Sequence, residues 1–147
     1  MKKLIPITCL WLLFSSTVLA TESSDAKSLF ARYQDMGRAF DPSVADLYCD
    51  SAVIRNVRTY PSGETKTLEL PATKYKALVR SVMPLAKARG DVSTFSQVRF
   101  VAEGENTRIT AARFSQLKNY TSPVSILVGP CEGSGLAILE ELSESQP

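Results

Sequence analysis

Acid and base chemistry in this chain must come from groups other than histidine. The 147-residue sequence contains no histidine, which removes the commonest general base near neutral pH, the commonest zinc ligand and every Ser-His or Cys-His nucleophilic pair. Carboxylates, tyrosines and lysines remain, and they act as acids or bases when burial shifts their pKa values. The sequence also lacks a glycine-rich phosphate loop, a cluster of metal ligands and a nucleophile elbow. We predict no cofactor and no metal.

Polar residues on the expected strands are the main candidates for a binding site. Arg113 and Glu141 have two orientations open to them. If they point inward, they form a buried ion pair or hold a small carboxylate ligand through a bidentate guanidinium contact. If they point outward, they are ordinary cross-strand charges, and a register shift of one residue exchanges the two cases. The same set contains Arg55, Asn56 and Arg99.

Cys49 and Cys131 are the other pair with distinctive chemistry. We expect Cys49 where a short helix meets the first strand and Cys131 just before the last hairpin turn. A structural disulfide between them is predicted, and its loop of roughly 83 residues would stabilise the fold by about 4 to 5 kcal/mol in the chain-entropy model. The absence of a Cys-x-x-Cys spacing disfavours a redox-active pair. Two buried free thiols are the alternative.

The first twenty residues have the pattern of a secretory signal peptide. Two lysines precede an apolar run over residues 4–19, and the small residue Ala20 follows. We predict cleavage after Ala20 and a bacterial protein that is periplasmic or secreted, with no stable membrane insertion after leader removal. A membrane anchor is the alternative, because an apolar run of about sixteen residues is near the lower limit for a spanning helix. Pro6 inside the run favours removal.

The mature chain, residues 21–147, has the length of one domain and no excess of basic residues. Loss of the two leader lysines lowers the basic count from 17 to 15, which equals the 15 acidic residues. Binding to nucleic acid needs a basic excess that neutralises several phosphates. The composition therefore argues against a nucleic-acid partner.

The spacing of apolar residues predicts three helices on the N-terminal side of the chain. The first covers residues 25–38, with Ser23 to Asp25 as capping residues, and Asp41-Pro42 starts a short second helix that ends near Cys49. A third helix begins at Pro71, and Pro84 is expected to kink or shorten its last turn.

Alternating patterns predict two groups of strands. A hairpin and, after Gly90, four strands of an antiparallel meander are expected, over residues 52–60 and 65–70, then 93–103, 107–120, 123–131 and 136–143.

This order of elements resembles the nuclear transport factor 2-like family, also called SnoaL-like, whose fold is a cone-shaped α+β barrel. The carriers of the resemblance are the segments Ser28 to Tyr33, Phe40 to Tyr48, Ser51 to Ile54 and Leu136 to Glu141. The resemblance implies an α+β fold with N-terminal helices packed against a strongly curved, mostly antiparallel sheet. It implies little about activity, because the fold hosts isomerases, dehydratases, hydrolases and binding modules.

The steroid isomerase branch of this family gives the sharpest comparison with an enzyme. Tyr33 matches the tyrosine that this branch uses as an oxyanion donor. The position of the branch's acidic base falls near Asn56, and an amide cannot abstract a proton. The resemblance therefore does not carry the isomerase activity to this chain, and Tyr33 is read as a half-buried core tyrosine with its hydroxyl at the mouth of a pocket.

We predict an exported domain that binds a small apolar or amphipathic ligand in its cone without turning it over, at Tyr33, Asn56, Arg113 and Glu141. One alternative is an interaction module whose open sheet face pairs with a second copy, as a homodimer, or with another exported protein. Another is a lyase or isomerase that combines Tyr33 with Asp46 or Glu141. A cavity at Tyr33 supports the first interpretation, an exposed apolar patch on the sheet the second, and a carboxylate within hydrogen-bond reach of the pocket the third.

Overall fold

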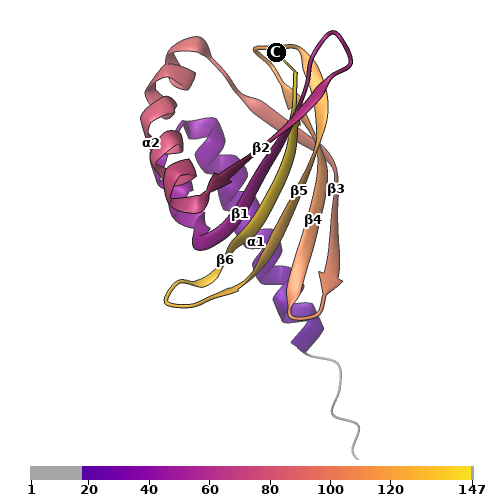
Figure 1. Cartoon of the computed structure of the whole chain (residues 1–147). Helices are drawn as coiled ribbons and strands as arrows, with labels where there is room; N and C mark the ends of the chain where they lie inside the picture. Colours follow the sequence, from indigo (N-terminus) through magenta and orange to yellow (C-terminus); the bar gives the residue numbers. More distant parts are fainter. Residues whose placement is uncertain (1–17, 147) are drawn as a thin grey trace, which may run out of the picture.

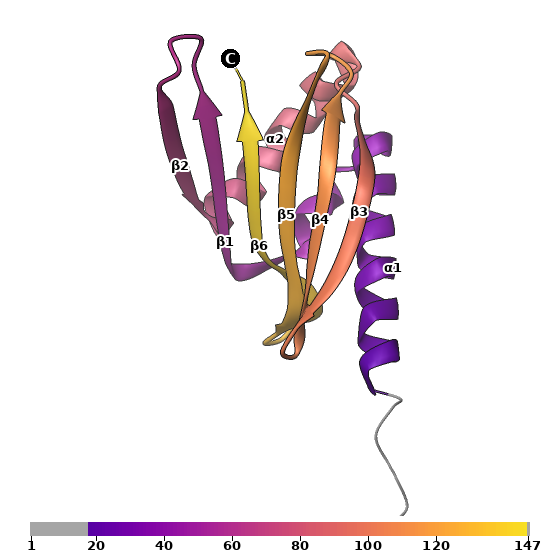
Figure 2. The ribbon, with the colours of Figure 1, turned by 90° about the vertical axis from the view of Figure 1, so that its right-hand side faces the viewer.

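Helices cover one face of a six-stranded sheet in the computed structural model of the chain, which describes residues 18–146 and their side chains from Ser24 onward (Figure 1). The helical segments are α1 (Val18–Ala39), the 3-10 helix η1 (Pro42–Leu47) and α2 (Ala72–Arg89). The strands are β1 (Tyr48–Thr59), β2 (Thr65–Pro71), β3 (Ser93–Glu103), β4 (Asn106–Ser115), β5 (Tyr120–Cys131) and β6 (Gly135–Ser145). Figure 2 shows the sheet from its uncovered face, with the helices behind and beside it. The predicted α+β class is confirmed.

The strand order β2-β1-β6-β5-β4-β3 joins the hairpin to the meander. Strands β3 to β6 pair antiparallel with their sequence neighbours, as predicted. Strand β1 pairs antiparallel with β2 and parallel with β6, so the last strand lies in the interior of the sheet. Glu141 on β6 pairs with Ile54 on β1 and with Ile126 on β5. These three side chains therefore lie on the same face of the sheet, the one that the helices cover.

Several predicted boundaries were wrong. Helix α1 begins at Val18, so Ser23 to Asp25 lie within the helix and do not cap its start. Strand β1 begins at Tyr48, which places Cys49 in the strand because pairing with β6 extends it beyond the alternating pattern. Helix α2 continues past the exposed Pro84 to Arg89, held on its other side by contacts with η1 and β1.

The predicted leader and its cleavage point are only partly covered by the structure. Residues 1–17 lie outside the described residues, and Cys9 lies among them. Within residues 18–146, no helix combines the length and the apolar character that a membrane crossing requires.

Isoleucine and valine side chains from the central strands form the core beneath the helices. Ile109, Ile126, Val128 and Ile138 are each no more than 1 % exposed. Helix α1 packs onto this layer through Phe30, whose ring meets those of Phe95 and Phe100 edge to face with centroids 5.6 and 6.1 Å apart. Burial of large aromatic surface of this kind is what holds a helix at a fixed place on a sheet.

Gly129 on β5 is expected to be one of the least tolerant backbone positions. A Cβ placed there would overlap the side chain of Asn106 and lie 2.8 Å from Leu139 Cδ1, so Gly129→Ala should lower the free energy of unfolding by about 1 to 3 kcal/mol. Gly37 within α1 is the matched control, because its added Cβ would meet no atom within 4 Å. Gly37→Ala should raise stability by about 0.5 to 1 kcal/mol, since glycine is disfavoured inside helices. Urea denaturation of both variants measures the contrast, and equal effects would contradict it.

Candidate functional site

A cavity of about 370 Å³ lies between the helices and the covered face of the sheet. Tyrosines from three elements reach it: Tyr33 from α1, Tyr48 from β1 and Tyr75 from α2. Arg113 from β4 contributes a guanidinium group. The rest of the wall is mainly apolar, formed by Phe40, Val44, Val79, Val82, Met83, Ala86 and Phe95. A mostly apolar cavity with a few polar groups is the usual form of a small-molecule site.

Aromatic contacts fix the tyrosine rings around the cavity. Tyr48 and Tyr75 meet edge to face with ring centroids 5.2 Å apart. Tyr33 stacks on Phe30 and meets Phe95 edge to face, both at 5.9 Å. Rings held in this way present their hydroxyl groups in fixed directions, which a binding site requires.

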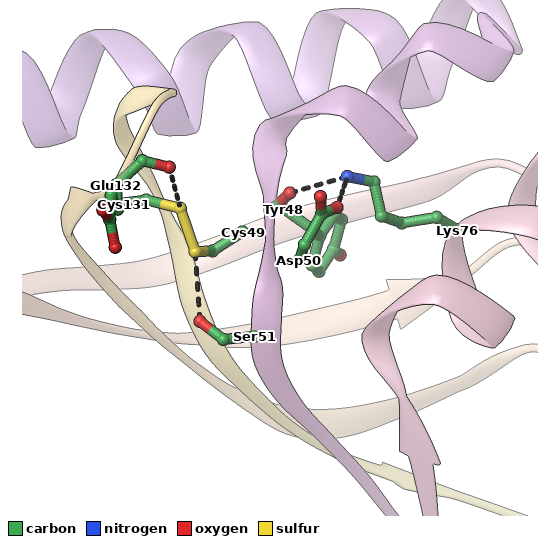
Figure 3. The surroundings of a disulfide bond; sticks show 7 residues. All are labelled: Tyr48, Cys49, Asp50, Ser51, Lys76, Cys131 and Glu132. Carbon is green, nitrogen blue, oxygen red and sulfur yellow. Dashed lines mark hydrogen bonds and ion pairs between the residues drawn. A yellow bond between two sulfur atoms is a disulfide. The ribbon is translucent and has the colours of Figure 1, made fainter.

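A disulfide and a lysine of α2 hold the first residues of β1, from Tyr48 to Asp50 (Figure 3). Cys49 forms the predicted disulfide with Cys131, with the two Cα atoms 5.9 Å apart, and so joins the start of β1 to the end of β5. Lys76 of α2 donates hydrogen bonds to the backbone carbonyl of Tyr48 at 3.0 Å and to Asp50 Oδ1 at 2.7 Å. Tyr48 is therefore positioned by a covalent cross-link and by a helix. A structural disulfide of this kind is typical of an oxidising compartment.

A buried carboxylate lies directly behind Tyr48. The Tyr48 hydroxyl donates a hydrogen bond to Glu141 Oε2, and Glu141 is only 2 % exposed. Burial raises the pKa of Glu141, and the hydrogen bond from Tyr48, the positive charge of Arg113 and the hydroxyl of Tyr75 partly oppose that rise. Glu141 therefore holds its proton to a higher pH than an exposed glutamate does.

The tyrosines stay neutral over the physiological pH range. Burial raises the pKa values of Tyr33, Tyr48 and Tyr75, and the negative charge of Glu141 raises each further. Neutral phenols both donate and accept hydrogen bonds. The tyrosines that line the cavity are therefore neutral hydrogen-bonding groups, and Tyr48 connects the cavity to Glu141.

The structure separates the residues that the sequence grouped as candidates. Tyr33 and Arg113 line the cavity, and Glu141 lies one contact behind it. Asn56 shares the helix-covered face but does not line the cavity: it donates to Ser143 Oγ at 3.0 Å and accepts from Ser145 Oγ at 2.7 Å. These contacts cross-link β1 and β6. Arg55 and Arg99 lie instead along a groove on the uncovered face.

Tyr48 and Tyr75 were not among the predicted site residues. The sequence pattern placed both on the apolar faces of helices, where they read as ordinary core residues. The available signal was chemical, since a tyrosine on a buried face needs a partner for its hydroxyl. That partner, Glu141, is 93 positions from Tyr48 along the chain and comes from a different part of the sheet.

The uncovered face of the sheet carries a wider groove of about 780 Å³. Small polar side chains from several strands line much of it, among them Thr67, Thr110 and Ser125. Arg55 in this groove forms an exposed ion pair with Glu69 at 2.7 Å, which contributes little to stability. The predicted pairing of the open sheet face with a second copy stays a prediction.

Metal chemistry has no evident donor set in the part of the chain that the structure describes. Within residues 18–146, no three His, Cys, Asp or Glu side chains come together as a metal site would require. The site residues themselves supply hydrogen-bonding groups, the positive charge of Arg113 and the carboxyl group of Glu141.

Comparison with known proteins gives matches in structure alone. Neither family models nor curated protein sequences match the chain. An NTF2-like protein of unknown function from Pseudomonas putida is similar, with a TM-score of 0.65 and 14 % identity over 88 % of this chain and 89 % of that one.

Two other solved structures are also similar to this chain. A proposed dehydratase of the NTF2-like family from Streptomyces avermitilis has a TM-score of 0.63 and 11 % identity, covering 86 % of this chain and 97 % of that one. A protein from Catenulispora acidiphila in complex with S-DNPA has a TM-score of 0.54 and 13 % identity, covering 85 % of this chain and 93 % of that one. Together with the helices over a six-stranded sheet, these matches show that the chain has the nuclear transport factor 2-like fold.

Proposed function

We propose that this protein binds a small, mostly apolar molecule in the cavity between its helices and its sheet. The observation that carries the proposal is the cavity of about 370 Å³, whose mainly apolar wall also contains three tyrosines, Arg113 and the polar residues Gln34, Asp91 and Ser93. The structurally similar protein from Catenulispora acidiphila is in complex with S-DNPA. The proposal includes export, which the disulfide between Cys49 and Cys131 supports.

Filling the cavity tests the proposal directly. Ala86 on α2 lines the cavity, so Ala86→Phe should occupy part of the space that a ligand needs. Ala88 on the same helix is exposed and does not line the cavity, which makes Ala88→Phe the matched control. We expect wild type and Ala88→Phe to retain a small molecule in native mass spectrometry, or to bind one from a library of aromatic and aliphatic compounds. Ala86→Phe should bind at least tenfold more weakly.

Two results would contradict the proposal. If neither wild type nor the control binds any compound at millimolar concentration, the cavity is not a ligand site. If both phenylalanine variants bind as well as wild type, the molecule is bound elsewhere. The melting temperatures of the same three proteins show whether Ala86→Phe is folded. A side chain that fills the cavity without overlap should leave the melting temperature close to that of wild type.

Acid-base catalysis in the same cavity is the second candidate function. The hydrogen bond from Tyr48 to the buried Glu141 favours it, because Tyr48 can pass a proton between a molecule in the cavity and a carboxyl group of raised pKa. A structurally similar protein is a proposed dehydratase. Chemical analysis of the bound compound before and after incubation distinguishes the two functions: binding leaves it unchanged, and a lyase or isomerase converts it.

A further inference from the structure

Arg113 has most of its hydrogen-bonding capacity free. Its side chain is half-buried at the cavity wall, and its Nη2 atom donates to the backbone carbonyl of Glu144 at 3.2 Å. Among the described residues, no carboxylate lies within 4.0 Å of its guanidinium group. Other arginines of the sheet do form ion pairs, such as Arg55 with Glu69. A guanidinium group has five N–H donors. The remaining donors are available to a molecule in the cavity.

The surroundings of Arg113 favour an anionic partner. The wall around the cavity is mainly apolar, so a charge pair formed there is less screened than one in water. The nearest buried acid, Glu141, already has the Tyr48 hydroxyl as its hydrogen-bond partner. The other acid at the cavity, Asp91, is exposed. A carboxylate is the anion that best matches a guanidinium group, because it accepts two parallel hydrogen bonds.

We propose that the ligand is a small aromatic or aliphatic carboxylic acid bound as its anion, an inference that rests on the proposed function. Its carboxylate pairs with Arg113, and its apolar body lies among Phe40, Val79 and Met83. Tyr33, which lines the same cavity, offers a further hydroxyl donor to the head group. The sequence left open whether Arg113 points inward. Because Arg113 lines the cavity in the structure, a carboxylate ligand is the class that we propose.

Glu141 links this binding to proton uptake. The groups that face Glu141 are Tyr48 from β1, Tyr33 from α1, Tyr75 from α2 and Arg113 from β4. An anion paired with Arg113 removes part of the positive charge that favours ionised Glu141, and it adds a negative charge nearby. Binding should therefore be accompanied by proton uptake wherever Glu141 is partly ionised.

Calorimetry with matched compounds tests the inference. The probes are 2-naphthoate and 2-naphthamide, which have the same apolar body and differ in charge. At pH 7 we expect wild type to bind the carboxylate at least tenfold more tightly than the amide. Arg113→Gln should weaken binding of the carboxylate roughly 10- to 100-fold, the range for loss of charged hydrogen bonds, and leave binding of the amide within about threefold. At any pH where Glu141 is partly ionised, titrations in two buffers of different ionisation enthalpy should differ in heat, because the protons taken up come from the buffer.

The controls separate the failure of this inference from failure of the proposed function. Arg99→Gln removes an exposed arginine from the opposite face of the sheet and should bind both compounds as wild type does. If wild type binds the amide as tightly as the carboxylate, or if Arg113→Gln weakens both equally, the carboxylate assignment is wrong and the cavity remains a ligand site. If neither these probes nor the wider compound library binds, the proposed function fails with it. Retained binding of the amide shows that Arg113→Gln is folded.

Discussion

Replacing Cys49 and Cys131 together by alanine should lower the free energy of unfolding by about 4 kcal/mol. The two cysteines are 82 positions apart, and cross-linking residues so distant removes a large part of the entropy of the unfolded chain. Cys49 is also 6 % exposed within the core, so alanine there leaves a small gap. Urea denaturation of the purified protein measures the loss.

Reductant supplies the control for this prediction. Reduction should destabilise wild type by a similar amount and leave the double alanine variant unchanged, since the variant has no bond to reduce. A difference below about 1 kcal/mol between wild type and the variant would show that the cross-link contributes little.

Tyr48→Phe should destabilise the protein by about 2 to 3 kcal/mol at neutral pH, with a smaller effect in acid. The variant removes the hydrogen bond to Glu141 and leaves that carboxylate buried. Burial raises the pKa of Glu141 above its value in the unfolded chain. The contribution of Glu141 to stability is thus fully present below the unfolded pKa and is lost as the pH rises through the folded pKa.

Loss of the Tyr48 hydroxyl makes this pH dependence steeper. The hydroxyl favours the ionised form of Glu141, so the pKa of Glu141 rises further in Tyr48→Phe. The difference in stability between the variant and wild type should therefore grow as the pH increases from about 4 to 7. Thermal unfolding across this range checks the trend, and Tyr60→Phe in the hairpin between β1 and β2 should show no such change. A difference that stays constant with pH would rule out the coupling to Glu141.

Local sequence patterns predicted most of the secondary structure. Strand β3 has the predicted bounds, Ser93 to Glu103, because alternation and the turns on either side are local properties. Asp41 caps η1 as predicted and accepts a hydrogen bond from the backbone N–H of Ser43 at 2.8 Å. The start of β1 at Tyr48 was missed, since it depends on pairing with β6 and not on the pattern around Tyr48.

The candidate site was predicted only in part, because some of its residues meet only through contacts between distant segments of the chain. Tyr33 and Arg113 carry chemical features that the sequence alone displays, and both line the cavity. Their neighbours Tyr48 and Tyr75 join them only through the packing of β1 and α2 against each other. Asn56 illustrates the converse, because its amide has the chemistry of a ligand-binding group but bonds to Ser143 and Ser145.

Because β6 lies between β1 and β5, the sheet is incomplete until this strand has joined it. Strand β6 follows the other five described strands along the sequence and fills the interior of the sheet, so a chain in which it has not yet paired has unpaired edges on both neighbouring strands. Contacts between residues as distant as Tyr48 and Glu141 also give the fold a high contact order, which slows folding. Until β6 has paired, these two edges are therefore open to strands of other chains.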